Sequence, residues 1–212
     1  MSPLGKQLVA EANRLGIVLD ASHASDDVLD QLIELSKSPI LLSHSGCKAL
    51  FDHPRNVDDA RLRKLAASGG VIQINSLGAY LKALPVSAER KLALAQLEQE
   101  YGDAEALTPE RAAAYRKARN ELNHRYPPVR ATFDDYMRHL LHALEVAGPE
   151  HVGIGADWDG GGGVEGLDDV SQLPKITARL LQAGYTRAQI ADIWSGNVLR
   201  VMRQAEAQRS AR

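Results

Sequence analysis

Cysteine is nearly absent from this chain of 212 residues. Cys47 is the only one, so no disulfide bond can form within the chain and a disulfide-stapled fold is excluded. The N-terminal residues lack the apolar core of a signal peptide, and no run approaches the ~20 apolar residues that cross a bilayer. We therefore expect a cytoplasmic protein as the sequence stands; a signal carried by a longer polypeptide would not be visible in this sequence.

The chain also lacks an excess of charge of either sign. Its 25 Lys and Arg residues face 27 Asp and Glu residues, which gives a formal net charge of −2. Such a balance provides neither the basic surface that binds nucleic acid nor the polybasic patch that binds anionic lipid. We therefore expect no nucleic-acid partner and no membrane partner, and a small molecule is the expected substrate.

Strand-like and helix-like segments alternate along the sequence. Apolar strand-like runs occur at 17–22, 40–43, 71–75 and 152–155, and amphipathic helical patterns separate them, with helix starts at Ser25, Asp58 and Phe133 and a capping box at Thr186 and Gln189. This alternation predicts an α/β fold with a parallel sheet wrapped by helices. Four strands are too few for a closed eight-stranded barrel.

Residues 86–129 differ in character from the rest of the chain. They are charged, rich in Ala and poor in β-forming residues; Thr108 and Pro109 mark a helix start, and Tyr126 with two prolines marks a stop. We predict a helical insertion within a single domain that spans 1–212. A solvated surface insertion is the simpler interpretation, and a lid over a site is the alternative.

Two strand-like runs lead into histidines that lie beside serine. The first is IVLDASH at 17–23 and the second is ILLSHS at 40–45, which place His23 and His44 where strands are expected to end. Neighbouring parallel strands lie about 4.8 Å apart, so both rings can converge at the carboxyl edge of the sheet and bind one metal ion. The alternative is that each imidazole only makes hydrogen bonds at a strand end.

Two further residues are candidates at the same edge. Arg55 follows the second histidine run and suits a carboxylate, which a guanidinium grips with two hydrogen bonds; the alternative is a loop pair with Asp58 or Asp59. Asp157 follows the fourth strand and can accept a proton or anchor a substrate.

A glycine-rich loop and a second pair of histidines are further features that could bind a ligand. The glycines at 160–163 could cradle a phosphate, but no lysine follows at the spacing of a phosphate loop and nearby carboxylates would repel the anion. His139 and His142 have a spacing that could chelate a metal, although we expect them on an exposed helix surface.

Together these motifs resemble the renal, or membrane, dipeptidase family. The resemblance rests on the two histidine runs, Arg55, GGVI at 69–72, GIGADWDG at 153–160 and GNVLRV at 196–201, and it covers nearly the whole chain. It implies a (β/α)₈ barrel with a binuclear zinc site that hydrolyses dipeptides. By position, His23 and His44 resemble two ligands of one zinc ion, Arg55 the arginine that holds the dipeptide carboxylate, and Asp157 the aspartate that contacts the substrate and assists proton transfer.

The sequence departs from the family in one large respect. The family's His-x-Asp pair, its bridging Glu and a substrate-binding His have no counterpart here, so the chain resembles only the last four βα units of the barrel. Three hypotheses follow: a zinc dipeptidase whose N-terminal half is absent from this chain and is supplied by another polypeptide or lost through a split reading frame, a non-catalytic half-barrel that acts as a binding or assembly module, and a fragment that binds a phosphorylated metabolite. A homodimer is a further possible assembly, because two half-barrels could pair and close the sheet.

Overall fold

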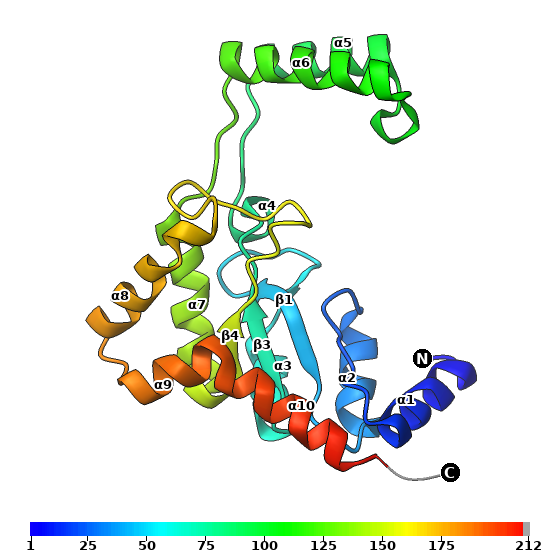
Figure 1. Ribbon diagram of the computed structural model, residues 1–212, viewed down its shortest axis with the longest axis vertical. Coiled ribbons are helices and arrows are strands. Elements are labelled where there is room, and N and C mark those ends of the chain that lie inside the picture. Colours follow the sequence, from blue (N-terminus) through cyan, green and yellow to red (C-terminus); the bar gives the residue numbers. More distant parts are fainter. Residues whose placement is uncertain (210–212) are drawn as a thin grey trace. The chain divides into compact units, whose positions relative to one another are not determined.

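The computed structural model describes residues 1–209 and contains a parallel sheet of four strands flanked by helices (Figure 1). The strands are β1 (Leu41–Cys47), β2 (Asn56–Val57), β3 (Val71–Ile74) and β4 (Val152–Ile154), in the order β2-β1-β3-β4. Every neighbouring pair is parallel, which confirms the predicted α/β class.

Local capping signals define several of the helices. The α-helices outside residues 84–130 are α1 (Pro3–Leu15), α2 (Asp26–Leu35), α3 (Asp59–Ala67), α4 (Gly78–Leu81), α7 (Phe133–Ala147), α8 (Pro174–Gln182), α9 (Arg187–Ala191) and α10 (Asn197–Ala207). Asp58 caps α3 by accepting from the amide of Arg61, and Thr132 and Thr186 form capping boxes at α7 and α9. A π-helical segment, Asp192–Gly196, joins α9 to α10 without a break.

The first predicted strand is wrong in its extent. Residues 17–22 are extended but form only one bridge to the sheet, between Asp20 and Leu41. The segment is confined between the C-terminal cap of α1, where the amide of Ile17 bonds to Ala12, and a turn closed by the amide of Ala24. A two-residue strand at Asn56–Val57, which the sequence pattern does not reveal, pairs with the far end of β1 instead.

The second predicted strand ends later than expected. β1 continues through His44 to Cys47, and its register against β3 shifts between Leu42 and Ser45. This shift is a β-bulge, in which an extra residue turns the side chains near it. Gly46 permits the continuation, because a Cβ atom there would lie 2.3 Å from the Oδ1 atom of Asn56. His44 therefore lies at a bulge within the strand rather than at its end.

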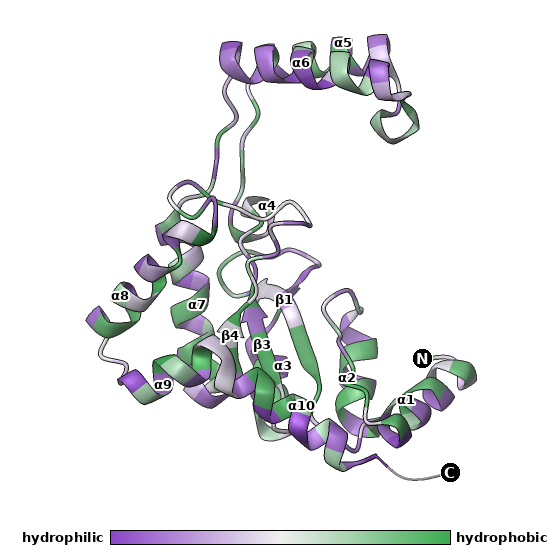
Figure 2. Ribbon diagram, viewed as in Figure 1, coloured by the Kyte–Doolittle hydropathy of each residue, from purple (hydrophilic) through white to green (hydrophobic). Residues whose placement is uncertain are grey.

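Apolar side chains from the strands and the surrounding helices form the core. α7 contacts β1, β3 and β4, α3 packs on α7 and β3, and α10 contacts β3 and β4. In Figure 2 the middle of the sheet is mostly hydrophobic, while the helices have polar sides. The largest fully buried side chains are Tyr136, Ile40, Leu42, Leu62, Leu65, Ile72, Ile74, Met137, Leu140, Leu167, Ile176 and Leu180.

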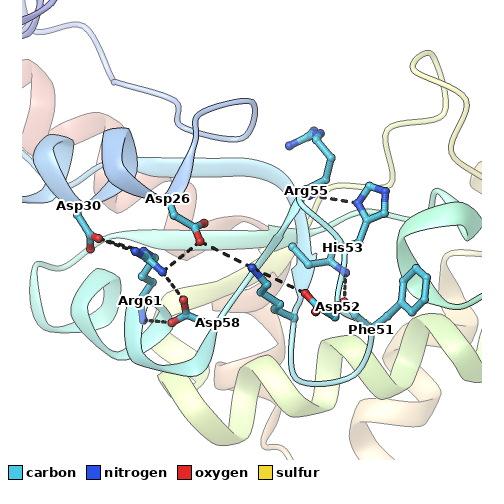
Figure 3. A network of polar contacts seen from close by, with 10 residues as sticks. Asp26, Asp30, Phe51, Asp52, His53, Arg55, Asp58 and Arg61 are labelled. Atoms are coloured by element: carbon cyan, nitrogen blue, oxygen red, sulfur yellow. Dashed lines mark hydrogen bonds and ion pairs between the residues drawn. The ribbon is translucent and has the colours of Figure 1, made fainter. Parts of the chain in front are cut away.

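An ion-pair network joins α2 to α3 (Figure 3). The guanidinium of Arg61 on α3 donates to Asp30 through Nε at 3.1 Å and Nη2 at 2.8 Å, and to Asp26 at 3.2 Å. Arg61 also pairs with Asp58, the cap of its own helix. One cation thus holds three carboxylates and ties two successive helices together.

Contacts divide the chain into two units, 1–83 with 131–212, and 84–130. The second unit is a helical hairpin of α5 (Ala88–Tyr101) and α6 (Pro109–Arg125), with Thr108 as the cap and Pro109 as the first residue of α6. Within it, the guanidinium of Arg90 donates to the carbonyl of Tyr126 and, at 2.8 Å, to Asn123.

No helix within residues 1–209 combines the length and apolarity that crossing a membrane requires.

Candidate metal and substrate site

The structure brings the rings of His23 and His44 together. His23 lies in the turn after the extended segment and His44 lies at the bulge of β1, and their Nε2 atoms are 2.8 Å apart. The ring centroids are 4.9 Å apart and the planes are inclined by 59°. His23 is exposed and His44 half-buried, so a ligand from solvent can reach both nitrogens.

Ser43 contacts the other side of the His44 ring, and Asp20 and Ser22 bond to the groups around it. Ser43 donates its hydroxyl to Asp20 and lies 2.8 Å from Nδ1 of His44. The amides of Ser22 and Ser43 also donate to Asp20, at 3.0 and 3.1 Å, and Ser22 accepts from the amide of His44 at 2.9 Å. Desolvation raises the pKa of Asp20, but the hydrogen bonds from Ser43 and Ser22 outweigh it and hold the pKa below its ordinary value. Asp20 is therefore an ionised acceptor at neutral pH.

Arg55 points to the histidines rather than to the acidic residues of α3. Its Nη2 atom lies 3.3 Å from Nε2 of His23, and its guanidinium lies 5.5 Å from the centre of the Tyr80 ring. The alternative pairing with Asp58 or Asp59 does not form, because Arg61 occupies Asp58 and His142 bonds to Asp59 at 2.8 Å.

Arg55 retains unused hydrogen-bonding capacity. Its Nε atom is buried without a hydrogen-bond partner, and no ion pair to a carboxylate is found for this residue in the described part of the chain. A buried donor without a partner is costly, and an incoming carboxylate would satisfy it.

The donor set fits a metal ion only in part. A guanidinium nitrogen can donate but cannot accept, so its contact with Nε2 of His23 indicates that this atom carries a lone pair. Two nitrogens bound to one tetrahedral zinc ion at about 2.0–2.1 Å are about 3.3 Å apart, so a small opening of the pair would seat an ion. Among residues 1–209, however, no group of three His, Cys, Asp or Glu side chains is placed to hold a metal. The chain supplies two ligands.

Asp157 lies two strands away from His44 and does not contact the histidines or Arg55 through any hydrogen bond found in residues 1–209. It follows β4 and has φ = 57°, the only non-glycine residue described with a positive φ. Its carbonyl accepts from the amides of Gly160 and Gly162, and its carboxylate rests against Gly160, where a Cβ would come within 2.5 Å. Backbone strain of this kind often accompanies functional sites.

The glycine loop has no spare donors for a phosphate. The amides of Gly160 and Gly162 bond to Asp157, that of Gly161 bonds to Trp158, and that of Gly163 bonds to Ser76. A phosphate loop presents such amides to the ligand, whereas here all four are used within the chain.

His139 corrects one expectation. It is only 1% exposed rather than on an exposed helix surface, and its Nδ1 atom accepts from the amide of Cys47 at 3.0 Å while Nε2 lies 3.0 Å from the carbonyl of Leu81. Burial lowers the pKa of His139 and raises that of the neighbouring Cys47 thiol to about 12. Both groups are therefore neutral and structural.

Sequence reasoning also missed Asp20, Ser43 and Tyr80. The available signal was the aspartate three positions before His23 and the serine directly before His44, but only the structure reveals that they hydrogen-bond to one another. No local pattern marked Tyr80.

The C-terminal GNVLRV segment is structural. Asn197 donates to the carbonyls of Pro149 and Val152, and Arg200 donates to those of Gly69 and Glu150. These bonds fasten α10 to the segments that enter β3 and β4.

Comparison with known proteins identifies the family of this chain. The family model described as "Membrane dipeptidase (Peptidase family M19)" matches residues 1–212. The chain belongs to the membrane dipeptidase family. Among similar proteins, Dipeptidase tcpJ of Claviceps purpurea is 30% identical over 207 residues, which cover 97% of this chain and 39% of that protein. The chain spans about two fifths of the length of the first curated relatives it matches.

Solved structures of membrane dipeptidase relatives share the fold. The probable dipeptidase PvdM from Pseudomonas aeruginosa has a TM-score of 0.75 and 33% identity, over 98% of this chain and 55% of that one. A metallopeptidase from Rhodobacter sphaeroides, described as liganded with a phosphinate mimic of the dipeptide L-Ala-D-Ala, has a TM-score of 0.69 and 25% identity, over 96% of this chain and 47% of that one.

Proposed function

We propose that this chain supplies part of the active site of a zinc-dependent dipeptidase, with His23 and His44 as ligands of one zinc ion. The observation that carries the proposal is the convergence of two Nε2 atoms to 2.8 Å beside an arginine that has no carboxylate partner among the described residues. Family membership makes zinc the expected metal and a dipeptide the expected substrate.

Arg55 and Asp157 are the proposed substrate residues. The guanidinium of Arg55 would exchange its contact with His23 for two hydrogen bonds to the free carboxylate of a dipeptide. Asp157 would contact the amino end of the substrate and accept a proton there. Zinc, when bound, supplies an activated hydroxide and polarises the peptide carbonyl. The dipeptide mimic bound to the Rhodobacter sphaeroides relative supports this substrate class.

The chain does not complete this site by itself. Catalytic zinc sites normally have three protein ligands and an open position, whereas the described residues provide two. We propose that the sheet is half of a (β/α)₈ barrel and that the remaining βα units, outside these 212 residues, supply the missing ligands. The relatives' greater length is consistent with this proposal.

An apolar surface at the edge of the sheet supports this arrangement. Leu4, Leu8 and Leu15 on α1 and Ile17 beyond it are 43–74% exposed and line one groove, which we term the α1 apolar surface. Residues 17–22 have no strand partner on their outer side within residues 1–209. An open edge beside an apolar surface favours docking of further βα units.

Zinc titration of the 212-residue chain tests the metal assignment. We expect weak stoichiometric binding that is lost when both His23 and His44 are replaced by Ala, and retained in His124→Ala, a matched change on α6. Equal zinc affinity in the wild type and the double variant would refute the assignment.

Reconstitution tests the substrate assignment. With a complementary chain that carries the remaining βα units of a family member, we expect dipeptide hydrolysis that the 212-residue chain alone does not show. Arg55→Ala should then weaken carboxylate binding by about 2–5 kcal/mol if the pair is buried. Turnover of a C-terminally amidated dipeptide at the same rate as the free dipeptide would contradict the role of Arg55.

A second candidate function is a non-catalytic module that assembles through its open edge. The shortage of metal ligands and the α1 apolar surface favour it. Sedimentation at micromolar concentration separates the outcomes: a dimer without hydrolytic activity in any mixture supports the assembly module, and activity on reconstitution supports the dipeptidase. A compact monomer with protected amides in residues 17–22 would contradict docking at this edge.

A further inference from the structure

We propose that Asp20 is a positioning residue that, through the hydroxyl of Ser43, fixes His44 in the tautomer with its proton on Nδ1 and its lone pair on Nε2. The proposal concerns the metal site suggested above. It rests on that proposed function only where it predicts an effect on zinc affinity. Its evidence is a chain of hydrogen bonds from the carboxylate of Asp20 through Ser43 to the imidazole.

The direction of the chain follows from counting protons. Ser43 has one hydroxyl hydrogen, and its oxygen has two lone pairs. Its neighbours are the carboxylate of Asp20, Nδ1 of His44 at 2.8 Å and the hydroxyl of Ser22 at 3.3 Å. An ionised carboxylate can only accept, and it is the strongest acceptor of the three. The hydrogen of Ser43 therefore goes to Asp20, and its oxygen must accept from His44.

The surrounding bonds are consistent with this direction. One oxygen of Asp20 accepts from the amides of Ser22 and Ser43, and the other oxygen is left for the hydroxyl of Ser43. Ser22 accepts the amide hydrogen of His44, so its own hydroxyl hydrogen can point to Ser43. Each donor and acceptor in the chain then has one role.

The consequence lies on the other side of the ring. With its proton on Nδ1, His44 has a lone pair on Nε2. The contact with Arg55 indicates a lone pair on Nε2 of His23 as well, so the two lone pairs face each other. Two acceptors 2.8 Å apart repel each other, so we expect the two rings to move apart in the metal-free chain and a bound cation to hold them together. Outer hydrogen bonds that orient a ligating histidine typically change metal affinity 10–100-fold.

Asp20→Asn provides a sharp test because it is expected to reverse the direction of the hydrogen bonds that run from residue 20 through Ser43 to His44. The carboxamide oxygen can keep the two backbone amides, but the new amide nitrogen would donate to Ser43. The hydroxyl hydrogen of Ser43, no longer held by a carboxylate, is then free to donate to Nδ1 of His44, which is a stronger acceptor than the hydroxyl of Ser22. The proton of His44 is expected to move to Nε2, where it blocks the metal. Ser43→Ala should leave a mixture of tautomers, and Ser43→Thr should restore the wild-type tautomer. Asp27→Asn, an exposed aspartate on α2, is the matched control.

The measurement is the tautomer of His44 in the metal-free ¹⁵N-labelled chain at pH 8, from two-bond ¹H–¹⁵N correlation spectra assigned with His44→Gln. We expect Nδ1–H in the wild type and in Asp27→Asn, and Nε2–H in Asp20→Asn. The same tautomer in wild type, Asp20→Asn and Ser43→Ala would overturn the proposal.

Zinc titration of the same samples separates the two proposals. We expect Asp20→Asn to bind zinc about 10–100-fold more weakly than the wild type. If the wild type binds no zinc but its tautomer depends on Asp20 and Ser43, the metal assignment fails and the positioning role stands. If zinc binds and the tautomer is insensitive to both residues, the positioning role fails and the metal assignment stands.

Discussion

Replacing Arg61 by Met should destabilise the protein far more than the same change at Lys64. Arg61 pairs with Asp26, Asp30 and Asp58, and its side chain is 21% exposed. Lys64 is 58% exposed and, among residues 1–209, pairs only with Asp30, at 3.1 Å. Exposed pairs contribute roughly 0.2–1 kcal/mol each, so three partly buried pairs sharing one cation are worth about 1–3 kcal/mol. Methionine keeps the apolar stem, which confines the change to the charge and its hydrogen bonds.

Urea unfolding at low salt measures this difference, since guanidinium chloride would itself screen the pairs. Near 1 M NaCl, where the screening length is about 3 Å, the loss in Arg61→Met should shrink. Hydrogen bonds from Lys64 and Arg61 outweigh desolvation and lower the pKa of Asp30, and those from Arg61 do so for Asp58. Their contribution is therefore present above the unfolded value of about 3.9 and is lost as pH falls through the lowered folded values. Arg61→Met and Lys64→Met variants of equal stability at low salt would refute the reasoning.

Two further changes probe the interior. Burial lowers the pKa of His139, so the folded protein should lose stability as pH falls below the unfolded value of about 6.5, by at most about 1.4 kcal/mol per pH unit. His139→Gln should flatten this dependence of stability on pH. Parallel pH–stability curves for the wild type and the variant would contradict the assignment. In Gly155→Ala the new Cβ would lie 2.1 Å from the carbonyl of Ser43, so we expect a loss of about 1–3 kcal/mol and weaker zinc binding through displacement of the bulge. Gly153→Ala, whose nearest contact is the flexible Gln73 at 3.1 Å, is the control, and equal effects of the two glycine changes would exclude this mechanism.

Features with local causes could be predicted from the sequence. The starts of α3 and α7 follow from Asp58 and Thr132, whose side chains cap the helices they precede. The convergence of the two histidines follows from a single helix-containing repeat, in which the extended segment 17–22 returns beside the start of β1 through the bridge between Asp20 and Leu41.

Features with distant causes could not be predicted. The bulge at His44 depends on pairing with β3 and on close approach to Gly155, which lies far along the chain. The burial of His139 depends on the amide of Cys47 and the carbonyl of Leu81, 92 and 58 residues away. The orientation of Arg55 depends on the ion pair between Arg61 and Asp58. The spacing of these residues in the sequence does not show which arginine pairs with Asp58.

The histidine pair also has a consequence for how the site is assembled and inherited. Asp20, His23, Ser43 and His44 all lie within one helix-and-strand repeat, and the paired histidines are 21 residues apart. Closing so short a loop costs little chain entropy, and local contacts of this kind form early in folding. The histidine pair and the residues that hydrogen-bond to it therefore stay together in any gene split, circular permutation or fusion that leaves residues 20–47 intact.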